Sequence, residues 1–251
     1  TTVARFGLAA PVLAVFARRH LREAASPVVA AWGAAGFGGV IMLQNAGIAR
    51  TSVTHAAVIL GAVPILTALA AAAAGHGPTP PRAWLGFVAA LIGIALVAGT
   101  GGAASTSGDL LMFASAVLSA ALIVAQTQLL EGRDPVAVTA VQMAAAAVAV
   151  LPVALVAGTP PAGLPTAGLS VALVALVTVG SLLPFTLYAW GQTQVSAQVA
   201  GAFVNLETLV GAVLGALAFG DPVGTLTVTG AIAIVLGIAL SAGSSDTGPV
   251  L

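Results

Sequence analysis

The chain has 251 residues, of which 59% are hydrophobic and only 6% are charged, and its formal net charge is zero. A soluble domain carries about 25% charged residues, so this composition excludes a soluble fold. The sequence has no basic patch with interleaved aromatic residues, which argues against nucleic acid as a partner. We therefore predict a polytopic membrane protein whose partners are the lipid bilayer and a small-molecule substrate.

Several kinds of chemistry lack the residues they need. Cysteine is absent, which excludes disulfides and thiolate metal sites, and lysine is absent, which excludes a Walker-type phosphate loop. The sequence contains neither an H-E-x-x-H nor a G-x-S-x-G pattern. We therefore expect no catalytic residue, no metal and no cofactor.

Nine apolar segments follow one another along the chain, and we predict that each is a membrane-spanning helix. Pro64 and Pro184 lie inside two of them and remove the backbone hydrogen bonds to the carbonyls of Leu60 and Gly180. Each freed carbonyl can bind a ligand or remain in a packed kink, and we favour the kink. The segments are Thr2–Phe16, Pro27–Gln44, Val53–Ala74, Trp84–Gly99, Leu110–Leu130, Val136–Ala157, Ala167–Trp190, Ala197–Gly220 and Thr225–Ala242.

The arginines in the loops set the orientation. If successive loops alternate sides, five arginines share one side and only Arg50 lies in a loop on the other. The positive-inside rule makes the first side cytoplasmic, and the C-terminal tail falls there too. We expect a multi-pass protein of the cytoplasmic (inner) membrane. The five arginines are Arg18, Arg19, Arg22, Arg82 and Arg133.

The sequence matches itself at a shift of 144 residues without a gap. Because alanine matches are frequent in so alanine-rich a chain, the glycine and proline matches carry the argument. At the N-terminal end the match continues loosely at a shift of 137, which pairs Arg5 with Gln142. The pairs at 144 are Gly47 with Gly191, Ser52 with Ser196, Pro78 with Pro222, Gly86 with Gly230, Gly93–Leu96 with Gly237–Leu240, and Gly99 with Gly243.

The repeat predicts the domain organisation. Residues 1–99 form a first repeat of four helices, 100–108 a Gly/Ser/Thr-rich linker, 109–243 a second repeat of five helices, and 244–251 a polar tail. The partner of the segment Leu110–Leu130 would precede Thr1. Two units of five helices in tandem must lie in the membrane in opposite orientations. The predicted fold is an all-α bundle of two inverted five-helix repeats with nine helices present.

Glu207 is the only acidic residue deep inside an apolar segment. A charge at that depth is tolerated when it is paired, protonated or faces a polar cavity. Gly211 and Gly215 follow on the same helical face, so we expect the carboxyl to face the bundle interior beside them. We take Glu207 as a substrate or coupling residue that can exchange a proton. The alternative is a protonated carboxyl that makes one hydrogen bond between helices.

Two polar stripes at helical spacing are candidate cavity linings. The first contains Ser115, Ser119 and Gln126, and the second contains Thr178, Ser181, Phe185 and Tyr188. Small polar residues also pack helices without any ligand, so this alternative remains open for each stripe.

Three further polar residues belong to the membrane segments or their ends. Gln142 joins the candidate substrate residues as the repeat partner of Arg5. Arg5 itself can bind an anionic group or extend to the membrane surface, and we expect the latter. His55 stands at a helix start, where we expect an interfacial histidine rather than a proton relay.

These features resemble the EamA-type transporters of the drug/metabolite transporter superfamily. The resemblance rests on two helical repeats and on the stretch LETLVGAVLGALAFGDPVG, followed by a helix that ends in GIAL. It implies ten helices with both termini cytoplasmic, of which this chain matches the second to the tenth. It also implies export or import of small metabolites and drug-like molecules.

The chain departs from the family pattern at three places. Thr208 stands where the family usually has a proline after the glutamate of the ninth helix. The family's Gly-Glu after that helix is Gly220-Asp221 here, and the first repeat has Gly75-His76.

We therefore expect a secondary transporter that moves a small metabolite or drug-like molecule by alternating access, with a proton as a candidate coupling ion. The alternatives are an intramembrane enzyme and a passive channel. An enzyme needs a nucleophile and base, or metal ligands, at matching depth, whereas a channel needs only a continuous pore.

The predicted topology can be tested by cysteine labelling, because the chain has no native cysteine. We expect an impermeant maleimide added to intact cells to label Thr159→Cys but not Arg133→Cys, and to label both after permeabilisation. Labelling of position 133 alone in intact cells would refute the assignment.

Overall fold

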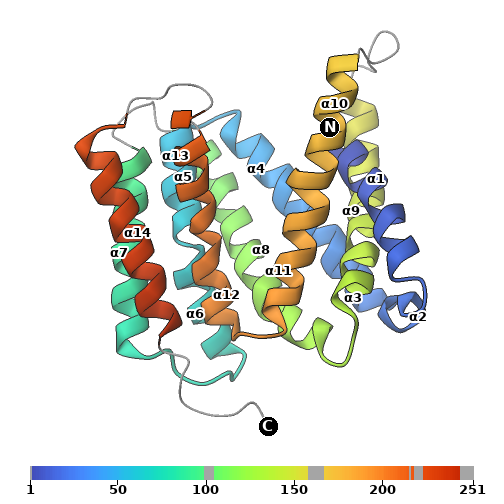
Figure 1. Cartoon of the computed structure of the whole chain (residues 1–251), viewed down its shortest axis with the longest axis horizontal. Coiled ribbons are helices and arrows are strands. Elements are labelled where there is room, and N and C mark those ends of the chain that lie inside the picture. Colours follow the sequence, from blue (N-terminus) through green and yellow to red (C-terminus); the bar gives the residue numbers. More distant parts are fainter. Residues whose placement is uncertain (1, 99–104, 158–166, 215, 218–222, 244–251) are drawn as a thin grey trace. The chain divides into compact units, whose positions relative to one another are not determined.

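The computed structural model describes residues 2–98, 105–157, 167–214, 216–217 and 223–243, and every regular element among them is helical (Figure 1). Seven of the described helices are long and apolar enough to cross a membrane, and two shorter apolar helices lie at Thr2–Phe16 and Ala197–Val210. These nine helices stand at the nine predicted positions. The all-helical membrane fold is therefore confirmed.

The elements are α-helices and two π-helical turns, η1 and η2. They are α1 Thr2–Phe16, α2 Leu21–Ala24, α3 Pro27–Trp32, η1 Gly33–Gly39, α4 Val40–Ile48, α5 Val53–Gly61, α6 Val63–Ala73, α7 Pro81–Ala98, α8 Thr106–Leu130, α9 Pro135–Ala157, α10 Ala167–Val177, η2 Thr178–Leu182, α11 Leu183–Gln192, α12 Ala197–Val204, α13 Leu206–Leu214 and α14 Thr225–Ala242.

Two helices begin three or four residues earlier than the apolar pattern predicted. α7 begins at Pro81, where a proline at the first helical position sacrifices no hydrogen bond. α8 begins at Thr106, inside the predicted linker, and carries Asp109 in its first turn, where a negative charge is favourable. The predicted end of the eighth segment at Gly220 lies outside the described residues.

Four interruptions break the long helices, and they fall at repeat-related places. Shifting η1 by 144 residues places it over η2. The break at Ala62, between α5 and α6, falls within one residue of the break at Asn205, between α12 and α13. The helices before these breaks also share their caps, because Ser52 and Ser196 are repeat partners and each caps its helix with its side-chain oxygen. Local structure thus repeats along with the sequence.

The chain divides into two compact units. Unit 1 contains residues 1–42 and 125–194, and unit 2 contains residues 43–124 and 195–251. Each unit therefore combines segments of both predicted repeats. Two helices, α4 and α8, contribute residues to both units.

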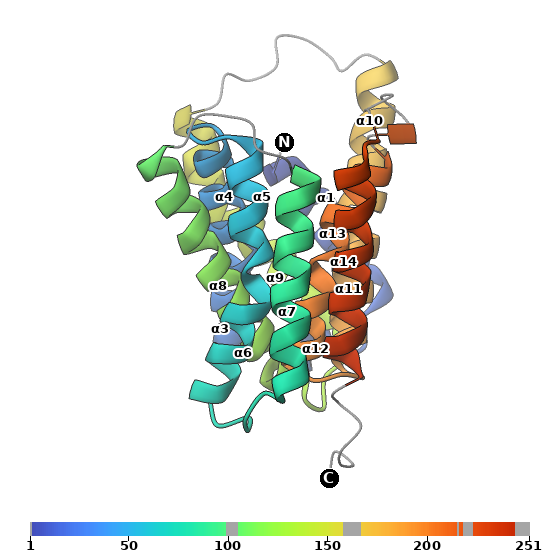
Figure 2. The same ribbon diagram turned by 90° about the vertical axis from the view of Figure 1, so that its left-hand side faces the viewer.

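In unit 2, the repeat partners α7 and α14 pack side by side and antiparallel (Figures 1 and 2). A Cβ on Gly93 would lie 2.5 Å from the carbonyl oxygen of Gly230, and one on Gly230 would lie 2.5 Å from that of Gly93. Gly86 and Gly237 approach each other just as closely. Gly86 is the repeat partner of Gly230, and Gly93 is that of Gly237. The two contacts are therefore related by two-fold symmetry. The local two-fold axis is perpendicular to the helices, which is the geometry of an inverted repeat.

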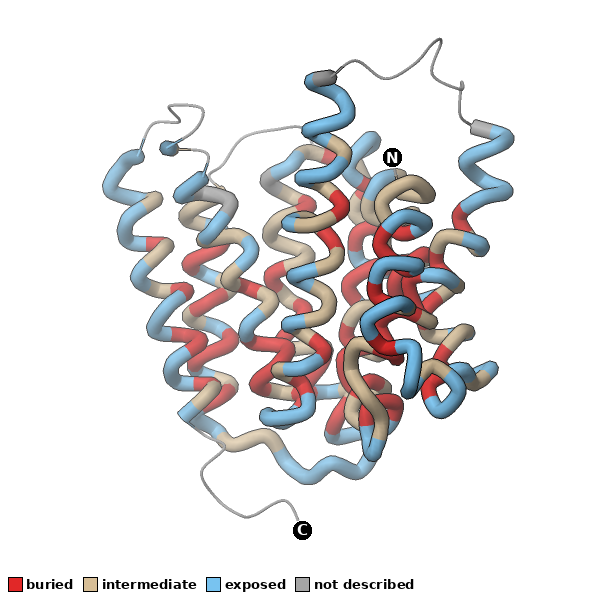
Figure 3. Tube along the Cα trace, turned by 45° about the vertical axis from the view of Figure 1, so that its right-hand side comes forward, coloured by how far each residue is buried: buried red, intermediate tan, exposed pale blue. Residues whose placement is uncertain are grey.

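Buried and exposed residues alternate along the helices (Figure 3). Many of the exposed residues have large apolar side chains. Phe16 is 79% exposed and Val156 is 91% exposed. Such surfaces suit lipid tails, which are as apolar as the side chains themselves. The buried residues include many alanines, which allow helices to approach closely, together with a few large side chains such as Phe6 and Phe87.

The α7–α14 contact predicts a difference between two glycines. Gly93→Ala should lower the free energy of unfolding by about 1–3 kcal/mol, because the new methyl group meets a carbonyl oxygen. Gly7→Ala is the matched control, since a Cβ there has no neighbour within 4 Å, and it should be neutral or stabilise by up to about 1 kcal/mol. Thermal unfolding in detergent micelles measures both. Equal stability of the two variants would contradict the close approach.

Candidate functional site

Arg5 in α1 binds the π-helical turn η2 of unit 1. Its Nε donates to the Ser181 hydroxyl at 2.8 Å, and its Nη2 donates to the Gly180 carbonyl at 2.7 Å. This carbonyl is the one that Pro184 was predicted to free. Arg5 therefore supplies the hydrogen-bond donor that the proline cannot. Our expectation that Arg5 extends to the membrane surface is wrong. The carbonyl of Gly180 carries a partial negative charge and accepts a hydrogen bond from the guanidinium, which keeps Arg5 inside the protein.

The guanidinium lies at membrane depth. Gly180 stands midway along the candidate span Gly168–Gln192. A cation at that depth is costly in lipid, and it normally faces a bundle interior or a polar cavity. The Arg5 guanidinium carbon also lies 5.2 Å from the centre of the Phe6 ring, within range of a cation–π interaction.

Three aromatic rings form an apolar wall next to Arg5. Phe6 contacts Phe185 edge to face with ring centres 5.8 Å apart, and Phe37 of η1 lies 4.7 Å from Phe185. Phe185 was predicted as part of the second polar stripe. Ser181 of the same stripe is buried, and its hydroxyl donates to the Leu176 carbonyl at 3.1 Å. The predicted stripe therefore combines a polar group that binds Arg5 with a ring that packs beside it.

Gln126 and Gln142 form a reciprocal amide pair in the interior of unit 1. Gln142 donates to Gln126 at 2.6 Å, and Gln126 donates back at 3.2 Å. Both side chains are buried, with Gln142 fully so. Gly33 of η1 packs directly against the Gln142 backbone, where any Cβ would collide. The structure thus brings together two site residues that were predicted from different arguments.

Arg5 and Gln142 occupy corresponding places in the repeat. Arg5 of α1 binds η2, which belongs to the second repeat, and Gln142 of α9 packs against η1, which belongs to the first. Each helix therefore contacts the π-helical turn of the other repeat. The two helix contacts are alike, but α1 carries the cationic side chain of Arg5, whereas α9 carries the amide of Gln142.

Two further hydroxyls of the predicted stripes bond to carbonyls of their own helices. Ser115 donates to the Met112 carbonyl and Thr178 to the Val174 carbonyl, each at 2.8 Å within its own helix. Ser119 and Tyr188 are half-buried. Ser115 and Ser119 belong to unit 2, whereas Gln126 belongs to unit 1, so the first stripe divides between the units.

Glu207 lies in the first turn of α13, directly after the helix break, and is exposed. This differs from the expected interior position. The preceding residue, Leu206, packs against the buried cluster of Ile94, Ile234 and Ile238, and the neighbouring position therefore turns outward. Gly215 of the expected groove lies outside the described residues. An acidic group still suits this place, because the first turn of a half-helix favours negative charge.

Two buried polar atoms lie at or near the helix break at Asn205. Asn205 is 2% exposed, and Thr67 of α6 packs against Gly201, one turn before Asn205. Within the described part of the chain, neither the Asn205 Nδ2 nor the Thr67 hydroxyl has a hydrogen-bond partner. Buried polar atoms without partners are uncommon and call for a bound group or water.

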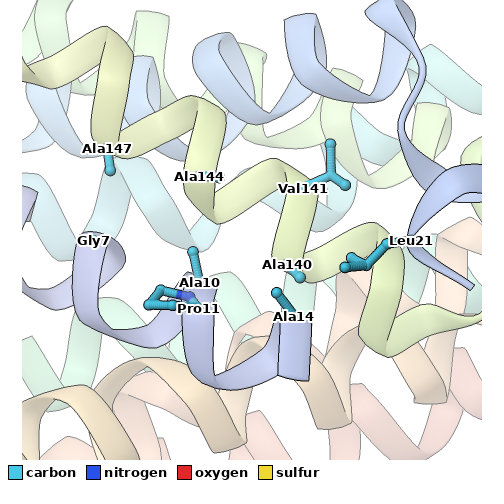
Figure 4. A pocket seen from close by; sticks show the side chains of 9 residues that line it. All are labelled: Gly7, Ala10, Pro11, Ala14, Leu21, Ala140, Val141, Ala144 and Ala147. Atoms are coloured by element: carbon cyan, nitrogen blue, oxygen red, sulfur yellow. The ribbon is translucent and has the colours of Figure 1, made fainter. Parts of the chain in front are cut away.

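A groove of about 500 Å³ is lined by α1, α9 and the first residue of α2 (Figure 4). Its lining contains no polar side chain, so it offers a polar substrate no side-chain hydrogen bond. The lining residues are Gly7, Ala10, Pro11, Ala14, Leu21, Ala140, Val141, Ala144 and Ala147.

Sequence reasoning missed Asp109. This residue accepts a hydrogen bond from Thr51 and lies beside His55, which had been interpreted as an isolated interfacial histidine. The apolar pattern placed Asp109 at the edge of a linker. Its position in the first turn of α8, opposite the first turn of α5, is the signal that could have identified the pair.

The amide pair predicts a non-additive mutant cycle. Gln142→Leu should destabilise the protein by about 1–3 kcal/mol, because it leaves the buried Gln126 amide without its partner. The double variant Gln126→Leu/Gln142→Leu should recover much of that loss. Thermal unfolding of the two single variants and the double variant measures the coupling. Additive losses would show that the two amides do not depend on each other.

Comparison with known proteins identifies the family. The model of the EamA-like transporter family matches residues 1–99 and 106–243. No curated protein matches the chain. A solved structure described only as the crystal structure of a protein is similar, with a TM-score of 0.82 and 19% sequence identity. The match covers 97% of this chain and 86% of that one, and at this identity it supports the fold alone. With its two matched repeats, its inverted helix pair and its membrane-spanning helices, the chain belongs to the EamA-like transporter family.

Proposed function

We propose that this chain is a secondary transporter that moves a small metabolite or drug-like molecule across the cytoplasmic membrane by alternating access. Membership of the family implies membrane transport of small molecules rather than enzymatic catalysis. Alternating access by a secondary carrier is a more specific mechanism than family membership implies. The observation that carries it is the pair of helix breaks at Ala62 and Asn205, which stand at repeat-related positions.

Broken helices serve transport because they place polar backbone and side-chain groups inside the membrane. Here the second break is followed at once by Glu207, in the first turn of α13. Its repeat partner, Val63, carries no charge, so the carboxyl is present in one repeat only. We propose Glu207 as the residue that binds either a coupling proton or an amine-bearing substrate.

Unit 1 supplies the groups best suited to a polar substrate. The Gln126 and Gln142 amides can each donate and accept, and Ser181 is buried beside the guanidinium of Arg5. We propose that these residues contribute to substrate binding. Ser115, Ser119, Thr178 and Tyr188 stay predictions, and the hydrogen bonds of Ser115 and Thr178 within their own helices favour a packing role.

Glu207→Gln tests the coupling role, because glutamine keeps the size of the side chain but removes its titration. We expect the purified variant to fold normally, and proteoliposomes containing it to lose uptake driven by an imposed proton gradient. The assay first screens a panel of amines, amino acids and carboxylates with the wild-type protein. Glu131→Gln is the matched control, since Glu131 is an exposed carboxyl in the turn after α8.

Two outcomes would contradict the proposal. Wild-type transport by Glu207→Gln, together with destabilisation by Glu207→Ala, would make the carboxyl a structural hydrogen-bonding group. Flux that neither saturates nor exchanges with substrate inside the vesicle would identify a channel rather than a carrier.

A further inference from the structure

Unit 2 contains a titratable pair, His55 and Asp109, that the proposed transport site does not use. The Thr51 hydroxyl donates to Asp109 Oδ1 at 2.5 Å, and His55 Nδ1 lies 3.2 Å from Asp109 Oδ2. The His55 side chain is 38% exposed and that of Asp109 is 29% exposed, so water reaches both. One carboxylate thus contacts Thr51 in the turn between α4 and α5 and His55 in the first turn of α5.

The backbone around the pair is held closely. Ser52 caps α5 by accepting from the His55 backbone N–H at 3.1 Å, which fixes the first turn of the helix. A Cβ on Gly108 would lie 2.7 Å from the Thr51 nitrogen, and one on Gly47 would lie 2.7 Å from the Met112 sulfur. These contacts hold the start of α8 against residues 47–51. The backbone contacts therefore hold the Asp109 carboxylate close to Thr51 and His55.

Few other charges act on this pair. Arg50 is exposed, and its Nη1 donates to the Ala46 carbonyl at 2.6 Å. α5 packs against α6, which has no charged residue, and against α7, whose only charged residue is Arg82 in its first turn. The sequence 99–105 that precedes α8 is uncharged as well. Among the described residues, His55 is the group able to carry a positive charge that contacts the Asp109 carboxylate.

We propose that His55 and Asp109 form a proton-binding site that clamps the first turn of α5 to the first turn of α8. In the neutral state, Nδ1–H of His55 donates to Asp109 Oδ2. A proton from water then binds Nε2 and produces an imidazolium that keeps the same hydrogen bond, now between opposite charges. Thr51 occupies the other carboxylate oxygen and supports the ionised form of Asp109. No bond other than the new N–H forms, and loss of that proton reverses the step.

The site deepens the proposed transport function and rests on it, because a proton bound here would act on a helix that both units share. Histidine ordinarily changes its charge between about pH 5 and 8. The hydrogen bond to the carboxylate is stronger when the imidazole carries the extra proton, so proton binding tightens the clamp and proton loss weakens it. By the arginine pattern, this end of the helices faces away from the cytoplasm, so the site would respond to external pH.

Nitrogen-15 NMR of histidine-labelled protein in lipid vesicles tests proton binding directly. The chain has three histidines, so His20→Gln and His76→Gln assign the spectrum. We expect neutral His55 at pH 8.5 to carry its proton on Nδ1, and both ring nitrogens to be protonated at pH 5.5. In Asp109→Asn the preference for Nδ1–H should be lost. A wild-type His55 that carries its proton on Nε2, or a tautomer that Asp109→Asn does not change, would overturn the site.

Hydrogen exchange measured by mass spectrometry tests the clamp. After correction for the intrinsic rate, peptides covering residues 50–62 and 105–115 should exchange about twofold to fivefold more slowly at pH 5.5 than at pH 8.5. His55→Gln should abolish the difference, whereas His76→Gln should keep it. Thr51→Val preserves the histidine–carboxylate pair, so it should keep the difference even if Asp109→Asn fails to fold. Persistence of the difference in His55→Gln would refute the clamp.

The two proposals fail in different experiments. Glu207→Gln should retain the pH-dependent exchange at residues 50–62 and 105–115, because Glu207 is not part of the pair. If that variant transports like the wild type while the exchange result holds, only the coupling role of Glu207 is wrong. If the exchange shows no pH dependence while Glu207→Gln loses transport, only the proton site at His55 is wrong.

Discussion

Lipid offers no hydrogen bonds, so each polar group inside a span must find its partner within the protein. The contact between Arg5 and η2 shows how this constraint shapes the structure. Pro184 removes one backbone donor, the helix widens into a π-helical turn, and the carbonyl of Gly180 becomes available. Arg5 then satisfies a carbonyl that would otherwise be orphaned, and that carbonyl holds a cation which would otherwise face lipid.

Close helix packing depends on the same constraint, because apolar side chains gain little by leaving lipid for protein. Contact must come from van der Waals packing of backbones, which only small residues permit. The reciprocal approach of Gly93 and Gly230 in α7 and α14 is the clearest case. Since these glycines are the ones that match in the internal repeat, the symmetry of the sequence and the symmetry of the packing have one cause.

Periodicity and composition predicted the spans well, since α1 and α14 have the predicted bounds and the other bounds that the structure describes differ by a few residues. The prolines also predicted which carbonyl would be freed at Gly180. The partner of that carbonyl could not be predicted, because Arg5 lies far from it in sequence and only tertiary packing brings them together. Asp109 was missed for a similar reason. Its importance comes from Thr51 and His55, which a linear pattern cannot place beside it.

The polar residues break the symmetry that the small residues create. Gly86 and Gly93 have glycines as repeat partners, whereas Arg5 corresponds to Gln142, and Glu207 corresponds to Val63. A symmetric scaffold makes two opposite arrangements of the helices close in energy, which alternating access requires. Charges placed in only one repeat then make the two arrangements chemically different. Substrate or proton binding can favour one arrangement over the other only through such a difference, because a ligand shifts an equilibrium by its differential affinity for the two states.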